Sequence, residues 1–276
     1  MPELPEVEMV ARELQRRIAG RTIVQADLRR EKLAPDVPPA AFAEQLAGAC
    51  VLSVHRRGKH ILIDLQNGRT LIVHLRMSGR FFLLSPDEAD PKFSHAVFHL
   101  DEGGRLVFDD QRHFGMMKIV DTGKIAETRE IAKLAPEPFS DDFSAVYLTE
   151  RVRSSARILK EILLDQTKVC GVGNIYASEA LFLSGIDPRK RGKRVSIVRC
   201  GGLHENIRAV LAEAIDSAES LQAHPTIIGE AVYGNGSDTR WRVYDRENQP
   251  CLVCGTSIRR ITQGSRSTYF CPKCQK

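Results

Sequence analysis

The 276-residue chain lacks the long apolar segments that membrane-spanning helices need. No apolar run approaches the roughly 18–20 residues of a membrane span. The first residues also lack the pattern of an export signal, because the acidic Glu3, Glu6 and Glu8 stand where a basic start and an apolar core belong. These absences predict a cytoplasmic protein that makes no contact with a membrane.

Two further classes of protein are excluded by what the sequence lacks. The seven cysteines are an odd number, which argues against a disulfide framework when no export signal is present. No G-x-G-x-x-G motif follows an expected strand, so the Gly-rich segment around Gly171 is not a dinucleotide-binding fingerprint. The net charge of +5 and the pI near 8.8 permit binding to nucleic acid without proving it.

The first half of the chain has the short segments that are typical of β-strands. They fall at about 22–29, 51–57, 60–66, 69–76, 80–84, 95–100, 105–109 and 116–121. Asn67-Gly68 and Gly103-Gly104 supply hairpin turns between strands. This regular spacing predicts an antiparallel sandwich or barrel. An amphipathic helix over residues 3–19 precedes it, and a short helix over 39–47 crosses one end.

The second half of the chain has a helical pattern instead. Pro136 and Pro138 break regular structure, and beyond them the hydrophobic period changes from two residues to that of a helix. We expect helices near residues 149–165, 174–184 and 196–221. The predicted organisation is a strand domain over 1–130, a linker over 131–148, a helical domain over 149–240 and a terminal module over 241–276.

The strongest local motif is a pair of CxxC sequences near the C-terminus. Cys251 and Cys254 are separated by sixteen residues from Cys271 and Cys274, which fits the spacing of a four-cysteine zinc site. Four thiolates can surround one tetrahedral Zn²⁺, and they leave no open position for catalysis. The sequence therefore predicts one structural zinc ion. The basic ribbon between the pairs suits a nucleic-acid groove, or alternatively a protein partner.

A second motif is the opening run MPELPE. Removal of Met1 would leave Pro2 with a free secondary amine, and a free α-amine with a pKa of about 7.7–8.0 is partly nucleophilic near pH 7. Attack of such an amine on an aldehyde-like carbon gives an iminium ion, and the carboxylates of Glu3 and Glu6 can transfer protons. Alternatively, Pro2 and Pro5 merely begin a helix whose dipole the two glutamates complement.

Four loops also carry candidate functional residues. Lys59 lies in a dense basic turn, and Met77 lies in a second turn between expected strands. Arg112 and Phe114 lie in a loop whose basic and aromatic composition is that of a wedge entering a base stack. Gly-rich sequence precedes Asn174, a natural N-cap, at a helix start that could bind phosphate. Each loop alone is also compatible with a solvated turn or ordinary packing.

In this order, the motifs PELPEVE, RRGKH, HLRMSG, QRHFG, LLDQTKVCGVGNIYASEAL and the four-cysteine finger resemble the formamidopyrimidine-DNA glycosylase (Fpg) family of the Fpg/Nei superfamily. The resemblance runs nearly end to end. It implies a multidomain α+β fold, in which an N-terminal antiparallel β-sandwich with a leading helix precedes a helix–two-turn–helix domain that carries a zinc finger.

The resemblance also implies a function. Members of this kind are bifunctional DNA glycosylases and AP lyases that excise ring-opened formamidopyrimidines and 8-oxoguanine from duplex DNA in base excision repair, and act as monomers. The Pro2 amine would form a Schiff base with C1′ of the damaged nucleotide, and Glu3 would shuttle protons before β,δ-elimination. Glu6 would support the N-terminus.

By the same resemblance, further residues acquire roles toward damaged double-stranded DNA. Residues that fill the gap left by the flipped nucleotide would be Met77, Arg112 and Phe114. The residues that bind phosphates would be Lys59, Asn174, Lys160 and Arg266. Two of them, Lys59 and Arg266, would also belong to the catalytic set with Pro2 and Glu3. His95 and His113 would also contact DNA.

The sequence departs from the family pattern at two places. His113 stands where the family usually has Arg or Lys, so we expect DNA affinity to fall more steeply above pH 7. Residues 223–240 do not align with the loop that covers the flipped base, which leaves the preferred lesion open. The alternatives are an endonuclease VIII-like glycosylase for oxidised pyrimidines, a non-catalytic damaged-DNA-binding protein, and a zinc-ribbon transcription or RNA-binding protein.

Overall fold

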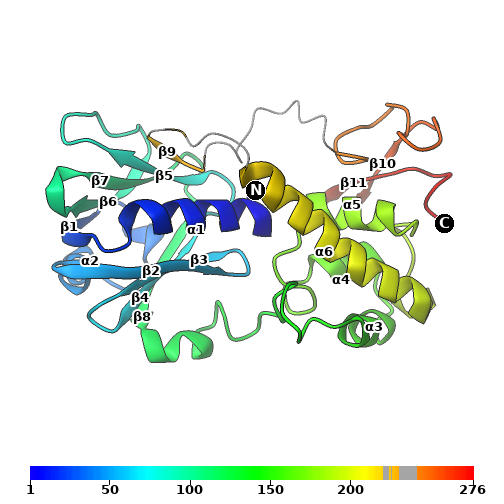
Figure 1. Cartoon of the computed structure of the whole chain (residues 1–276), viewed down its shortest axis with the longest axis horizontal. Helices are drawn as coiled ribbons and strands as arrows, with labels where there is room; N and C mark the ends of the chain where they lie inside the picture. The colour runs from blue at the N-terminus through cyan, green and yellow to red at the C-terminus, as the bar shows by residue number, and fades with distance from the viewer. Residues whose placement is uncertain (220–223, 225, 230–240) are drawn as a thin grey trace. The chain divides into compact units, whose positions relative to one another are not determined.

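The computed structural model describes residues 1–219, 224, 226–229 and 241–276 (Figure 1). The chain divides into two compact units. One comprises Met1–Ala132 with Ser217–Gly234, and the other comprises Lys133–Asp216 with Asn235–Lys276. Among the described helices, none is both long enough and apolar enough to cross a membrane.

The first unit begins with helix α1 (Leu4–Ile18). Apolar residues at helical spacing give this helix a buried stripe, which includes Val10 and Leu14. The helix ends at Ile18, and the chain then turns through Gly20 with a φ of 83°, a backbone conformation that glycine adopts without a steric cost. A helix with this amphipathic pattern is held by what its apolar face covers, so its N-terminus has a fixed place in the unit.

A nine-stranded antiparallel sheet forms the body of this unit, in the order β8-β4-β3-β2-β1-β6-β7-β5-β9. The strands are β1 (Thr22–Leu28), β2 (Ala49–Arg57), β3 (His60–Leu65), β4 (Arg69–His74), β5 (Gly79–Leu84), β6 (Ser94–Leu100), β7 (Arg105–Asp110), β8 (Met116–Asp121) and β9 (Ile227–Ile228). The short helices are η1 (Glu31–Leu33), α2 (Pro39–Leu46), η2 (Asp101–Gly103) and η3 (Thr122–Glu127).

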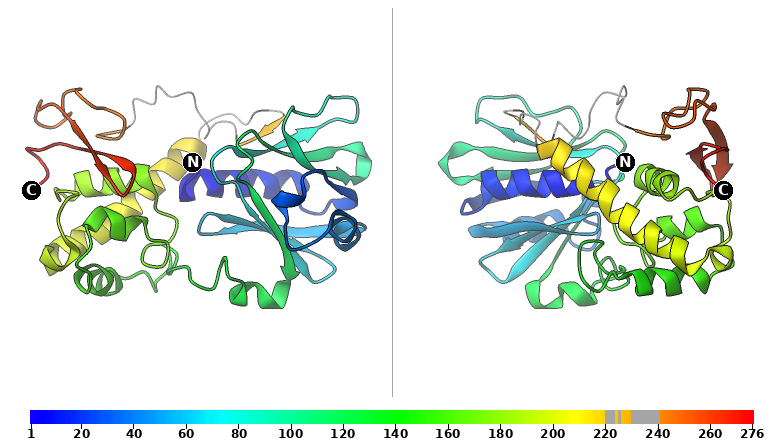
Figure 2. Two further views of the ribbon diagram at one scale, coloured as in Figure 1. Left: turned by 180° about the vertical axis from the view of Figure 1, so that it is seen from behind. Right: turned by 45° about the vertical axis from the view of Figure 1, so that its right-hand side comes forward.

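The sheet folds into two layers around α1. Only two residue pairs, Thr22 with Cys50 and Ile23 with Ala49, join β1 to β2, so the sheet can bend there. The views in Figures 1 and 2 show α1 between the two layers. The core contains buried side chains from α1 and from both layers, among them Leu14, Ile63 and Phe98. The predicted antiparallel sandwich with a leading helix is therefore confirmed, although its two layers are one continuous sheet.

Strand β9 is a part of this sheet that the sequence did not predict. Residues 226–229 follow α6 in the chain, yet Ile227 and Ile228 pair with Phe82 and Phe81 of β5. The buried Glu13 of α1 accepts the Gly229 amide at 2.6 Å. The remainder of the segment 223–240, except for residue 224, lies outside the described residues, and with it the lesion-covering loop that the sequence left unaligned.

The second unit is mainly helical. Its elements are α3 (Ala145–Arg153), α4 (Leu159–Leu164), α5 (Asn174–Leu183), η4 (Gly192–Arg194), α6 (Ile197–Glu219, whose last residues belong to the first unit), β10 (Arg259–Gln263) and β11 (Arg266–Phe270). The segment predicted as one linker over 131–148 already contains the first turn of α3. The two last strands form the ribbon expected between the CxxC pairs.

The single helix expected over residues 149–165 is wrong. The chain forms α3 and α4, and it breaks between Ser154 and Ile158. There the backbone bonds to a distant segment instead of continuing the helix: Leu159 N donates to Lys190 O at 2.7 Å, and Gly192 N donates to Arg157 O at 3.0 Å. No Gly or Pro marks this break, because its cause is a tertiary pairing.

Candidate active site and zinc centre

The start of α1 places two carboxylates beside Pro2. Glu3 is the N-cap of the helix, and its side chain accepts the backbone amide of Glu6. The Glu6 carboxylate in turn accepts the Glu3 amide at 2.7 Å. This reciprocal capping box satisfies two amides that a helix start leaves without intrahelical partners. Pro2, Glu3 and Glu6 are all buried, so the first turn holds both acidic groups in a fixed, largely dry place.

Helix α1 is fixed by polar bonds to the sheet as well as by its apolar face. Arg56 on β2 donates to Glu8 at 2.6 Å, and the Gln15 side chain accepts the Val54 amide at 2.5 Å. Both contacts join α1 to β2, the strand that leads into the turn carrying Lys59. The N-terminal residues and the Lys59 turn are therefore attached to one another through a single strand.

The basic turn expected at residues 55–60 is a tight hairpin between β2 and β3. Arg57 pairs with His60, and Gly58 takes a φ of 60° at the tip. The side chain of Lys59 is buried, with 6% of its surface exposed. The turn is therefore part of the packed body of the unit and not a solvated loop.

His60 of this hairpin and its partner His74 on β4 are two buried, neutral histidines. The rings of His60 and His74 meet edge to face, with centroids 4.7 Å apart. Burial lowers the pKa of His60 to about 4 and that of His74 to about 2. His74 Nδ1 accepts the Arg76 amide at 2.9 Å, so this nitrogen carries no proton. The pair therefore adds no charge next to Lys59 at neutral pH.

Two turns of the same unit present apolar side chains to solvent. Met77, between β4 and β5, is 42% exposed, and Phe114, between β7 and β8, is 55% exposed. The Arg112 guanidinium lies over the Phe114 ring, 5.4 Å from its centroid. Exposed large apolar side chains at turn tips, with a cation beside one of them, have the composition of a wedge that enters a base stack.

A buried carboxylate joins these two turns. Asp110 is fully buried and accepts the Ser78 hydroxyl at 2.5 Å on Oδ1 and the Gly115 amide at 2.6 Å on Oδ2. Ser78 Oγ also accepts the Arg112 amide at 3.0 Å. Ser78 follows Met77, while Arg112 and Gly115 flank Phe114. Asp110 is a residue that the sequence analysis missed, because its partner Ser78 is far away in the chain.

His113 is exposed and packs against His95. His95 Nε2 lies 2.9 Å from Asp110 O and 2.8 Å from His113 Nδ1. A carbonyl only accepts, so the proton belongs on His95 Nε2, and His113 Nδ1 is then an acceptor. Burial lowers the pKa of His95. The pairing therefore holds His113 against the buried His95, and the expected fall of DNA affinity above pH 7 stays a prediction.

In the second unit, three of the predicted phosphate-binding residues converge on β11. Lys160 Nζ donates to Ser267 O at 2.9 Å and to Thr268 Oγ1 at 2.8 Å. Asn174 Nδ2 donates to the same Ser267 carbonyl at 2.9 Å. Arg266 is the adjacent residue, and its side chain is exposed at the tip of the ribbon. One strand end therefore collects the side chains of α4, α5 and the zinc ribbon.

The expected N-cap role of Asn174 is wrong. Gly173, and not Asn174, is the N-cap of α5, and Asn174 is the first residue of the helix. Its side chain is thus released from capping to reach Ser267. Lys160 is only 1% exposed, and its ammonium bonds to β11 inside the unit. Its expected phosphate contact stays a prediction.

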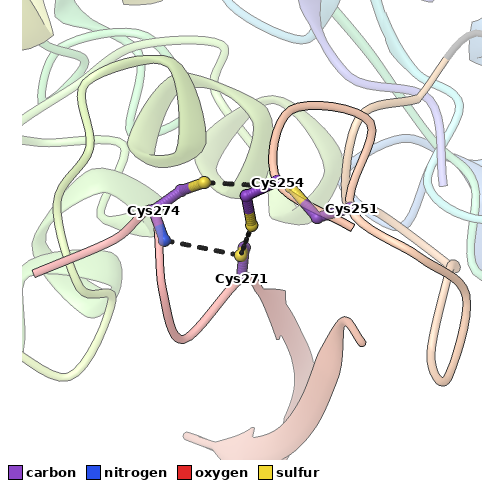
Figure 3. Close-up of side chains that lie close together, drawn as sticks. All are labelled: Cys251, Cys254, Cys271 and Cys274. Atoms are coloured by element: carbon purple, nitrogen blue, oxygen red, sulfur yellow. Dashed lines mark hydrogen bonds between the residues drawn. The ribbon is translucent and has the colours of Figure 1, made fainter. Parts of the chain in front are cut away.

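The four cysteines of the CxxC pairs meet as predicted (Figure 3). Their sulfur atoms all lie within 4.8 Å of one another, with Cys251 and Cys274 at 3.9 Å and Cys254 and Cys271 at 3.5 Å. Tetrahedral Zn²⁺ with bonds of about 2.3 Å requires sulfur atoms separated by about 3.8 Å, so the geometry fits. Hydrogen bonds from Thr256 lower the pKa of Cys254 to about 6, whereas burial raises the pKa of Cys271 and of Cys274, so Cys254 is ionised at a lower pH than these two.

Family models match three successive parts of the chain. Residues 1–117 match the formamidopyrimidine-DNA glycosylase N-terminal domain, residues 134–224 its H2TH domain, and residues 248–276 a zinc finger found in FPG and IleRS. The chain belongs to the formamidopyrimidine-DNA glycosylase family. This membership confirms the predicted fold, the single structural zinc ion and the enzyme class, a bifunctional DNA glycosylase and AP lyase of DNA repair.

Full-length relatives of this family are similar to the whole chain. The formamidopyrimidine-DNA glycosylase of Chloroflexus aggregans is 44% identical over 280 residues, covering 100% of this chain and 98% of the relative. That of Dinoroseobacter shibae is 42% identical and covers 100% of each. A solved complex of Lactococcus lactis Fpg with abasic-site DNA has a TM-score of 0.91 at 32% identity, over 99% of each chain.

A second buried carboxylate in this glycosylase also escaped the sequence analysis. Glu179 on α5 is fully buried, and it accepts the amides of Arg242, Val243 and Tyr244, each at 2.9 Å. It thereby fixes the segment that leads into the zinc finger. A buried acid inside an apolar helix is a signal that could have identified Glu179. Glu13 and Asp110 also lie near apolar residues in the sequence, but there the pattern is weaker.

Proposed function

We propose that this enzyme, which acts on oxidised purines in damaged duplex DNA, uses the amine of Pro2 as its nucleophile once Met1 has been removed. The observation that carries the proposal is the capping box, which fixes the carboxylates of Glu3 and Glu6 in the first helical turn, directly after Pro2. Met1 is 48% exposed whereas Pro2 is buried, so removal of Met1 takes away an exposed residue and leaves the amine in a fixed place. A nucleophile that is held in place reacts faster than one on a loose tail, because it is already oriented toward its target.

The chemistry follows from a secondary amine beside two carboxylates. The Pro2 nitrogen attacks C1′ of the damaged nucleotide and loses its N–H proton, and the bond from C1′ to the base breaks with its electron pair leaving on the base, which takes up a proton. Glu3 protonates O4′ as the sugar ring opens, and the nitrogen lone pair then forms the C1′ iminium ion. The iminium acidifies the C2′ proton. Removal of the C2′ proton expels the 3′ phosphate by β-elimination, and loss of the C4′ proton then expels the 5′ phosphate by δ-elimination.

We assign the exposed side chains of the two wedge turns to the space left by the flipped nucleotide. Extruding a nucleotide and unstacking its neighbours costs a few kcal/mol, and less at a damaged base. Met77 and Phe114 offer exposed apolar surface for that space. Arg112, held over the Phe114 ring, offers hydrogen-bond donors toward the orphaned base. The exposed His113, which is paired with the buried His95, belongs to the same surface.

Phosphate contacts complete the proposal. Arg266 is exposed, and Asn174 has a second side-chain N–H besides the one that Ser267 accepts. Lys59 brings a cation to the tip of the β2–β3 hairpin. Cations and amides of this kind position a nucleic-acid backbone without reading its sequence. Because one chain supplies all these groups, we infer that the enzyme acts as a monomer, in the cytoplasm where a bacterial chromosome lies.

The preferred lesion is the finer part of the proposal. Solved complexes of Lactococcus lactis Fpg contain DNA with ring-opened Fapy-dG and also DNA with an oxidized pyrimidine, each with a TM-score of 0.91 to this chain at 32% identity. We place ring-opened purines and 8-oxoguanine first, since the PELPEVE opening is that of the purine branch. Oxidised pyrimidines are the second candidate.

Product analysis on lesion-bearing duplexes tests this function. Duplexes with one 8-oxoguanine, one ring-opened guanine or one thymine glycol are incubated with the enzyme, and the ends of the cut strand are identified. We expect faster cutting at the two purines and a one-nucleotide gap with phosphate on both sides. Cutting only at thymine glycol would move the enzyme to the pyrimidine branch. Binding with no cutting at any lesion or abasic site would identify a damage-binding protein instead.

A further inference from the structure

We propose that Asp110 is a positioning residue that couples the two wedge turns, so that Met77 and Phe114 enter the base stack as one rigid unit. The proposal rests on the proposed function of those turns and adds the group that makes them act together. It concerns residues of the first unit only. Nothing in the amino-acid pattern around Met77 or Phe114 points to this coupling, which forms when β5 pairs with β7 and the Asp110 carboxylate reaches both turns.

The contacts of Asp110 divide between the two turns. Oδ1 accepts the hydroxyl of Ser78, which follows Met77, at 2.5 Å, and Oδ2 accepts the amide of Gly115, which follows Phe114, at 2.6 Å. The Arg112 amide lies 3.3 Å from Oδ1 and 3.0 Å from Ser78 Oγ. A carboxylate with one oxygen on each side therefore links the turns, and Ser78 closes the link by both donating and accepting.

The surroundings leave little room for another arrangement. Asp110 has 0% of its surface exposed, so water does not compete for its oxygens. A Cβ added at Gly115 would lie 2.8 Å from the Phe108 ring and 3.2 Å from Asp110 Oδ2, which shows how closely the second turn packs onto the carboxylate. At Gly79, which follows the first turn, an added Cβ would lie 2.7 Å from the same Phe108 ring and 2.6 Å from Leu75 O. Both turns are thus held against the same strand end.

The exposed tips contrast with this buried base. Met77 and Phe114 are 42% and 55% exposed, so much of each side chain lies outside the packed body of the unit. Their positions are therefore set by the turns from which they project. An apolar wedge that keeps its shape before it meets DNA does not lose conformational freedom on insertion. Removing the link should thus slow the extrusion step and leave the chemistry at Pro2 unchanged.

The test compares Asp110→Asn with Asp109→Asn, a matched control on the same strand. Asp109 is also buried, but its carboxylate accepts the Phe93 amide at 2.9 Å and pairs with Arg80 of β5 at 3.7 Å, and neither partner is a wedge-turn residue. Asn keeps the shape of Asp, but an NH₂ group replaces one of the two carboxylate oxygens. This donor would face the Ser78 hydroxyl or the Gly115 amide, each of which donates to the carboxylate. Ser78→Ala is the second variant, since Ser78 is only partly buried and its loss breaks the link while Asp110 stays.

Two measurements are made on each variant. The first is the rate of base extrusion, followed by the fluorescence of 2-aminopurine placed beside an 8-oxoguanine in duplex DNA. The second is β,δ-elimination at an abasic site in single-stranded DNA, which needs no extrusion from a duplex. We expect Asp110→Asn to extrude about 10- to 100-fold more slowly, because hydrogen bonds to a buried charge are lost. Ser78→Ala should be slowed less, and elimination in single strands should stay within about twofold for both.

The outcomes separate this inference from the function on which it rests. Wild-type extrusion kinetics in Asp110→Asn, or equal losses in Asp110→Asn and Asp109→Asn, would overturn the coupling role. An equal loss of extrusion and of single-strand elimination would assign Asp110 to general stability and also overturn it. If Asp110→Asn does not fold, unchanged extrusion by Ser78→Ala has the same meaning. Absence of elimination by the wild-type enzyme would instead contradict the proposed function.

Discussion

The two units hold their functional side chains by different means. In the first unit, buried carboxylates accept backbone and hydroxyl groups from turns: Glu3 and Glu6 cap one another, and Asp110 joins two loops. In the second unit, a metal site and a buried lysine do this work, with four cysteines at the base of the ribbon and Lys160 bonded to β11. The difference shows that preorganisation requires fixed polar groups, which a protein or a metal can supply.

Zinc removal should give the largest effect and confine it to the second unit. Structural zinc contributes about 10–16 kcal/mol in isolated finger peptides, far more than any single hydrogen bond. We expect Cys271→Ser or chelation to lower duplex affinity by at least about 100-fold, because Arg266 loses its place. Hydrogen exchange by peptide should show lost protection in β10 and β11 and unchanged protection in β3 and β7.

The control for zinc removal is Cys50→Ser, a cysteine outside the cluster that should keep the metal and the affinity. Equal loss of exchange protection in β3 and β7 on chelation would contradict the separation between a metal-held and a protein-held unit.

An intermediate effect should follow from Phe114→Ala. Phe114 is 55% exposed, so its removal should leave the unfolding free energy unchanged within about 0.5 kcal/mol. Excision of 8-oxoguanine from duplex DNA should slow by about 10- to 100-fold, because the wedge no longer offsets unstacking. Leu52→Ala is the matched control, since Leu52 is 58% exposed on the same unit but outside the wedge. Equal excision rates in the two variants would remove Phe114 from the site.

The smallest effect concerns the acid stability of the first unit. The pKa of His74 is about 2 in the folded chain and about 6.5 in the unfolded chain. Between these two pH values the unfolded chain therefore binds more protons than the folded chain. Stability therefore falls as the pH drops below about 6.5, by up to about 1.4 kcal/mol per pH unit for this residue. His74→Asn keeps an acceptor for the Arg76 amide and cannot titrate.

Urea unfolding at pH 7.5 and pH 5 measures this contribution. We expect His74→Asn to lose about 2 kcal/mol less than the wild type between the two values. His55→Gln, at an exposed ring on β2, should behave as the wild type does. An identical acid loss in His74→Asn and wild type would show that His74 does not contribute to the acid sensitivity of this unit.

The parts that sequence reasoning could predict are those encoded in neighbouring residues. The zinc ligands come as two CxxC pairs, the strands alternate in polarity, and Pro2, Glu3 and Glu6 lie within one helical turn. Each pattern requires only local geometry, so it could be derived without knowledge of the fold.

The parts that could not be predicted depend on pairing between distant segments. The break between α3 and α4 comes from bonds to residues 190–192, and β9 exists because residues 227–228 meet β5. Asp110 and Ser78 are brought together only when β5 pairs with β7. Asn174 had the composition of an N-cap, but the fold gave it a partner on β11 instead.

Borohydride trapping tests the central claim most directly. The enzyme is mixed with duplex DNA that carries one 8-oxoguanine opposite cytosine, borohydride reduces any iminium to a stable amine, and the adduct is located by peptide mapping. The account predicts one crosslink, at an N-terminal Pro2 that has lost Met1, and none with undamaged duplex. A crosslink at a lysine such as Lys59 or Lys160, or excision without any crosslink, would contradict it.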